Sequence, residues 1–69
     1  MLPRTTPELA EVTLHTAAAF VRQSGLRVWV VVPREAGVVA LARAIADEVG
    51  LEVEVELTAG TVSVGFSMD

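Results

Sequence analysis

One histidine in this 69-residue chain has neighbours that could support acid–base chemistry. His15 follows Glu11 by one helical turn and precedes Arg22 by two turns. A carboxylate beside a histidine can tune a general base. However, no serine, cysteine or second carboxylate is placed in the sequence to complete a nucleophilic system around His15. We therefore interpret His15 as a surface residue on a polar helix face, and we predict that the protein is not an enzyme.

Three glutamates alternate with apolar residues in the segment LEVEVEL, residues 51–57. In a strand, Glu52, Glu54 and Glu56 would point to one side, about 7 Å apart. A hard cation needs a more compact shell of oxygen ligands, and the absence of cysteine and the single histidine disfavour a zinc site. We predict no metal and no cofactor, and we expect the glutamates to form a surface.

The segment PREAG, residues 33–37, follows an expected strand and precedes an expected helix. Ligands of open α/β sheets bind at the carboxyl ends of strands, and helix N-termini favour anions. Arg34 is therefore the candidate anion-binding residue. Glu35 opposes an anion, and the glycine pattern is neither a Walker loop nor a dinucleotide fingerprint. We interpret the segment chiefly as an ordinary capped turn, with the anion site as the alternative.

Apolar residues recur with helical periodicity in two segments. The first helix is expected over 7–24, with either Thr5 and Glu8 or Thr6 as its cap, and with Gly25 just past its end. The second lies in REAGVVALARAIADEVG and ends at Gly50. The expected apolar stripes are Leu9, Ala10, Leu14, Ala17, Phe20 and Val21 in the first helix and Val38, Leu41, Ala42, Ile45 and Val49 in the second.

Alternating and β-branched residues predict three strands. The first covers 27–32, and the other two form a hairpin around Ala59-Gly60. The fold class is α/β, as an α+β two-layer sandwich in the order helix–strand–helix–strand–strand, with a three-stranded mixed sheet and both helices on one face. We favour the strand order 1-3-2, because it makes Gly65 a neighbour of Trp29, and an aromatic ring over a cross-strand glycine is a known device.

The sheet face that the helices leave open is the candidate interaction face. If alternate valines of the first strand point at the helices, Trp29 and Val31 point away from them. Antiparallel sheets often leave one face to solvent, but tryptophan beside valine favours docking of a partner or a second copy. The interaction face is expected to contain Arg27, Trp29, Val31, Glu52, Glu54 and Glu56, with Thr61, Ser63, Gly65 and Ser67 on the last strand.

Composition bounds the remaining possibilities. A chain of 69 residues forms a single domain, 1–69, and 52% hydrophobic residues without cysteine favour stabilisation by self-association. The net charge of −4 argues against nucleic-acid binding. No segment reads as a signal peptide or membrane span, so a cytoplasmic location is expected, and arginine without lysine suggests a bacterial genome.

We predict an interaction or regulatory module that forms a homo-oligomer through its open sheet face, with a basic protein as a further candidate partner. The alternative is a small ligand- or nucleic-acid-binding domain that uses the strand ends and residues 33–37.

Over residues 7–68, the order of elements resembles a known fold in topology only. This chain lacks the first strand of that fold. That fold is shared by the SirA/TusA-like sulfur carriers, the Alba proteins and the C-terminal domain of translation initiation factor 3. The sulfur carriers have a Cys-Pro motif at the start of their first helix. The corresponding stretch here is Thr5-Thr6-Pro7-Glu8, without a thiol. The resemblance therefore implies a fold and no sulfur transfer.

Overall fold

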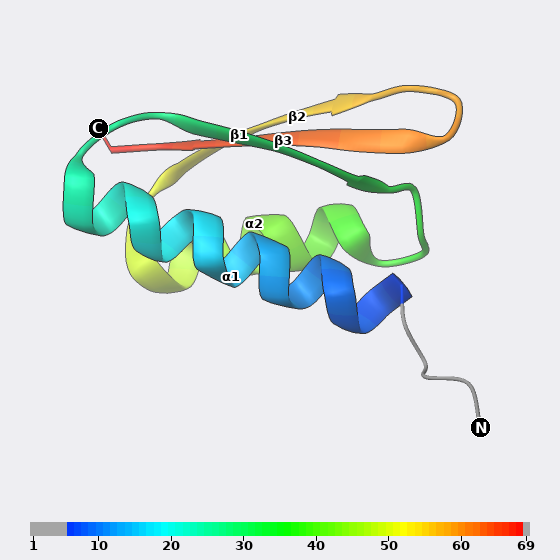
Figure 1. Ribbon diagram of the computed structural model, residues 1–69, viewed down its shortest axis with the longest axis horizontal. Helices are drawn as coiled ribbons and strands as arrows, with labels where there is room; N and C mark the ends of the chain where they lie inside the picture. Colours follow the sequence, from blue (N-terminus) through cyan, green and yellow to red (C-terminus); the bar gives the residue numbers. More distant parts are fainter. Residues whose placement is uncertain (1–5, 69) are drawn as a thin grey trace.

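Two helices and three strands follow one another in the order that the periodicity predicts (Figure 1). A computed structural model describes the backbone of residues 6–68 and the side chains of residues 10–68. The expected cap at Thr5 and Glu8, or at Thr6, lies outside these described side chains. The elements are α1 (Thr6–Ser24), β1 (Val28–Pro33), α2 (Val38–Val49), β2 (Glu52–Leu57) and β3 (Thr61–Ser67).

The strand order is β1-β3-β2, as predicted, with β3 in the centre. β3 is antiparallel to both of its neighbours. The expectation of a mixed sheet is therefore wrong. β1 and β2 do run in the same direction, but β3 separates them, so no parallel pairing forms.

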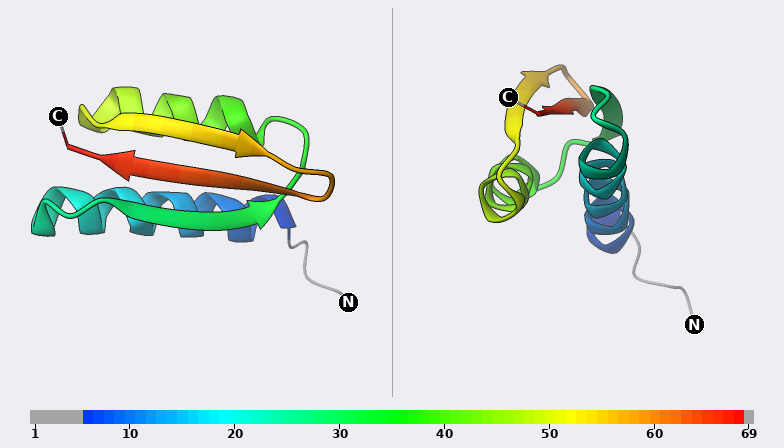
Figure 2. Two further views of the ribbon diagram at one scale, coloured as in Figure 1. Left: turned by 90° about the horizontal axis from the view of Figure 1, so that it is seen from above. Right: turned by 90° about the vertical axis from the view of Figure 1, so that its left-hand side faces the viewer.

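Both helices cover the same face of the sheet, so the protein is a two-layer α+β sandwich (Figure 2). α1 lies beneath β1, and α2 lies beneath β2. The core between the layers is apolar, and no polar or charged side chain is buried among residues 10–68. Its fully buried large side chains are Leu14 and Val21 from α1 and Val62, Val64 and Phe66 from β3. The central strand thus supplies much of the core because both helices pack against it.

Phe20, expected in the core, is half exposed, and so are the apolar side chains of Leu57 and Met68. Phe20 is 50% exposed and lines a groove between α1 and β1, because α1 lies under the outermost strand. Leu57 is the last residue of β2, and Met68 follows the last residue of β3. The alternation of the strands continues to these positions, but the helices no longer cover them.

Both helices end as the sequence predicts, at glycines in the left-handed conformation. Gly25 has φ of 76°, and its N–H donates to the Val21 carbonyl at 2.7 Å. Gly50 has φ of 77°, and the N–H of Leu51 donates to the Ala46 carbonyl at 2.8 Å. Each bond satisfies one carbonyl in the last turn of its helix, and the glycines turn the chain into β1 and β2.

Candidate interaction surface

The open sheet face, defined as the face of the sheet turned away from α1 and α2, carries the predicted residues. Trp29, Gly65 and Glu54 are direct neighbours across the three strands. Val31, Ser63 and Glu56 form the next row. The prediction that Trp29 shares a face with the glutamates is therefore confirmed. Glu52 lies opposite Ser67, and Arg27 is exposed just before β1.

The indole of Trp29 lies over Gly65. A Cβ placed on Gly65 would be 2.6 Å from Trp29 Cε2, which is closer than two carbons can approach. Glycine is thus the residue that lets the ring lie against the sheet. The side chain remains 46% exposed, and Val31 beside it on β1 is 63% exposed. An apolar platform at β1 therefore faces solvent on the open side of the sheet.

Charge is distributed unevenly across this face. Glu54 and Glu56 on β2 are exposed, whereas β1 contains no ionisable residue at all. Thr61 and Ser63 lie between them on β3, as half-buried polar residues. The face thus runs from apolar at β1 to acidic at β2. Such a surface can bury an apolar group of a partner at one side and attract basic groups at the other.

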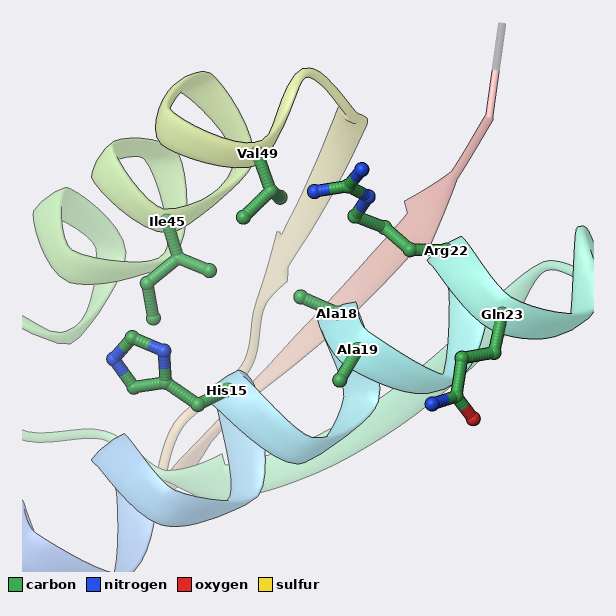
Figure 3. A pocket seen from close by; sticks show the side chains of 7 residues that line it. All are labelled: His15, Ala18, Ala19, Arg22, Gln23, Ile45 and Val49. Atoms are coloured by element: carbon green, nitrogen blue, oxygen red, sulfur yellow. The ribbon is translucent and has the colours of Figure 1, made fainter.

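His15 lies in a shallow groove between α1 and α2 (Figure 3). Its ring points toward Ile45, and the side chain of Arg22 points toward Val49. His15 Nε2 is 3.9 Å from Glu11 Oε2, and both side chains are about half exposed. An ion pair of this kind contributes little in water. The groove is lined by His15, Ala18, Ala19, Arg22, Gln23, Ile45 and Val49, a set without a nucleophile.

Arg34, the candidate anion-binding residue, is used to hold the β2–β3 hairpin. Its Nη1 donates to the Thr58 carbonyl at 2.9 Å, and its backbone N–H donates to the Gly60 carbonyl at 3.1 Å. Arg34 also lines a groove beside α2, together with Glu35 and Arg43. α2 begins after Gly37, and no side chain caps its N-terminus. The turn that precedes α2 is closed by a backbone hydrogen bond from the Val38 N–H to the Glu35 carbonyl, and not by the expected cap. The geometry gives Arg34 a structural role.

The sequence reasoning missed an apolar groove on the other side of β1. It has a volume of about 390 Å³ and lies between α1 and β1. Val12, at 62% exposed, and Phe20 contribute its large side chains on α1. The order 1-3-2 makes β1 an edge strand, but it does not say how far α1 lies toward that edge. The lining residues are Val12, Thr13, Thr16, Ala17, Phe20, Val28 and Val30.

Within the residues described, no group of three histidine, cysteine, aspartate or glutamate side chains could hold a metal ion. In the same part of the chain, neither helix has the length and apolarity needed to cross a bilayer. No protein-family model, curated protein or solved structure matches the chain. The topological resemblance to the sulfur carriers and Alba proteins is therefore not confirmed, and function has to be argued from the surface itself.

Proposed function

We propose that the protein is a small non-enzymatic protein-interaction module that acts as a homo-oligomer and docks a partner on its open sheet face. One observation carries this proposal. Trp29 is half exposed on that face, and its ring lies against the sheet over Gly65, which has no side chain to keep it away. Tryptophan is enriched among the residues that dominate binding energy. A ring already held in place loses little further freedom when a partner covers it.

The chemistry of the face favours a basic partner. Glu54 and Glu56 lie across the sheet from Trp29 and Val31, and the chain has a net charge of −4. A protein segment with an apolar anchor flanked by arginine or lysine would cover Trp29 and meet the carboxylates together. The charges would chiefly speed association and select the partner, while the apolar contact would supply most of the affinity.

The alternative, ligand or nucleic-acid binding at residues 33–37, has weaker support. Arg34 already donates to the Thr58 carbonyl, and Glu35 lines the same groove. A phosphate there would meet a carboxylate and an acidic protein. Nucleic-acid binding depends on cationic groups that neutralise phosphates, and the chain has only five of them against nine acidic residues.

The proposal is tested by quantitative affinity capture from a bacterial lysate with the wild type and three variants. Trp29→Ala should weaken a captured partner about 30-fold, as loss of a binding hot spot of about 2 kcal/mol does. Glu54→Arg should weaken capture of a basic partner, more so at low salt. Glu48→Arg makes the same change of charge on α2, at an exposed position away from the open sheet face, and is the matched control. Equal capture by all four proteins, or equal loss with Glu48→Arg, contradicts the proposal.

A further inference from the structure

The two edges of the sheet are built differently. Within the described residues, β1 and β2 each pair only with β3, so each strand has one open edge. The β2 edge carries Glu52, Glu54 and Glu56, which is how proteins usually protect an open edge from pairing with other strands. The β1 edge has the sequence VWVVVP and carries no charge. In the described part of the chain, Pro33 ends this edge, and the charged residues next to the strand are Arg27 and Arg34, which flank it.

The backbone of β1 presents pairing groups at this open edge. The N–H of Arg34 donates to Gly60, the residue opposite it. In an antiparallel ladder, pairs that exchange hydrogen bonds alternate with pairs that do not, so Val32, Val30 and Val28 bond to β3. Trp29 and Val31 therefore direct their N–H and C=O groups away from β3, at the open edge. Pro33 has the same phase, and its missing N–H costs no bond within the sheet.

Apolar side chains gather on both sides of this edge. Trp29 and Val31 lie on the open sheet face, and Val12 and Phe20 line the groove on the helix side. Leu26 is exposed in the segment that leads from α1 into β1. Of the exposed large apolar side chains described, only Leu57 and Met68 lie elsewhere. Among the described residues, the exposed apolar surface is thus concentrated around the β1 edge.

We propose that the β1 edge is where two copies of this chain meet, an inference that rests on the homo-oligomer of the proposed function. Two β1 strands would pair antiparallel about a two-fold axis and form one continuous six-stranded sheet. Trp29 would then lie opposite the second copy's Val31, and about four backbone hydrogen bonds would join these residues in the two copies. The α1 helices would lie side by side, and Phe20 would be covered together with Val12.

Charge disfavours two other symmetric arrangements. Pairing of two β2 edges would place the glutamates of one copy beside those of the other. Face-to-face packing with β2 over β2 would bring the two acidic rows to within about 10 Å. Pairing through β1 leaves five strand spacings between the two β2 strands, about 24 Å. That separation exceeds the Debye length of about 8 Å at physiological salt, so the carboxylates of the two copies barely interact.

The test compares proline substitutions on the two edges by light scattering after size exclusion. Val31→Pro removes an N–H that faces the open edge of β1. Val55→Pro does the same on β2, because the hydrogen bond from Thr58 N to Thr61 O directs the Val55 N–H away from β3. We expect a dimeric wild type at about 100 µM. Val31→Pro should raise the dissociation constant at least about tenfold, and Val55→Pro should leave it unchanged.

Circular dichroism establishes that each variant is folded. If Val31→Pro does not fold, Val31→Lys tests the same edge, because a lysine there keeps the backbone intact and blocks pairing. A monomeric wild type at about 100 µM overturns the inference, as does a dimer that survives both substitutions of Val31. A dimer that Glu54→Arg tightens at low salt overturns it in favour of face-to-face packing, because that substitution relieves repulsion between two acidic rows. The capture experiment tests partner docking separately. Absence of β1 pairing would not contradict the proposed docking face, and failure of capture would not contradict β1 pairing.

Discussion

The indole of Trp29 lies over Gly65, with Trp29 Cε2 only 2.6 Å from the position that a Cβ on residue 65 would take. This contact joins the edge strand to the central strand on the open sheet face. It also places the largest side chain of the protein where a partner can reach it. Packing within the monomer and the proposed docking surface therefore depend on the same pair of residues.

Gly65→Ala should displace the indole and lower the free energy of unfolding by about 1 kcal/mol. The ring is half exposed and can swing away, so we expect lost packing and a red-shifted fluorescence of the single tryptophan. In a Trp29→Ala background the same change should be neutral or slightly stabilising, because alanine loses less backbone entropy than glycine. Urea unfolding of the four proteins measures this coupling. Equal costs of Gly65→Ala in the two backgrounds would show that the contact is not responsible.

His15→Ala should change the free energy of unfolding by less than about 0.5 kcal/mol. The histidine is about half exposed, and its only described ion pair, with Glu11, is long. Leu14→Ala, one position away on the same helix, should cost about 2–5 kcal/mol because Leu14 is fully buried. Thermal and urea unfolding compare the two variants. A loss of partner capture with His15→Ala in a protein of normal stability would revive an active role for the groove between α1 and α2.

The fold was predictable because its signals are local or involve a single residue pair. Helical periodicity, strand alternation and the glycines at 25 and 50 each specify their element within a few residues of sequence. The strand order required one long-range inference, from Trp29 and Gly65. The same inference should have excluded a mixed sheet, because a central β3 that is antiparallel to β2 through a hairpin leaves β1 no parallel neighbour.

The surface was predictable only where it follows from alternation. The open sheet face depends on which way β1 faces, and the register of Trp29 with Gly65 settles that. The apolar groove depends on how far α1 lies toward the edge of the sheet, which periodicity does not encode, and so Phe20 was placed in the core. The hydrogen bond from Arg34 to Thr58 joins residues 24 positions apart. Local sequence carried no sign of it.

Gly50→Ala should lower the free energy of unfolding by about 1 kcal/mol, because alanine at φ of 77° is strained. Gly60→Ala is the matched control. Its backbone is not in the left-handed region, and a Cβ there would have no atom within 4 Å. We expect a change below about 0.5 kcal/mol at Gly60, measured by urea unfolding. Similar costs at both positions would mean that the left-handed cap at Gly50 is unimportant.

Arg34→Gln should lower the free energy of unfolding by about 0.5–1.5 kcal/mol, the net contribution of one hydrogen bond. Arg43→Gln, in the same groove but without a described hydrogen bond, should have less effect. Inorganic phosphate should stabilise the wild type no more than either variant. The contrary result would be that phosphate raises the melting temperature of the wild type but not that of Arg34→Gln. That result would show that Arg34 binds anions, and it would support the alternative function.

Dimerisation should depend only weakly on salt if two copies meet at β1. β1 itself carries no charge, and the two rows of glutamates would lie about 24 Å apart, well beyond the Debye length of about 10 Å at 0.1 M salt. We expect the dissociation constant to change by less than about threefold between 50 and 500 mM salt. Glu54→Arg should leave this dependence unchanged. In face-to-face packing with β2 over β2 the rows would repel one another, so that salt would tighten the dimer strongly and Glu54→Arg would abolish the effect. Sedimentation equilibrium of both proteins across this range distinguishes the two arrangements, and strong tightening of the wild-type dimer by salt would contradict pairing through β1.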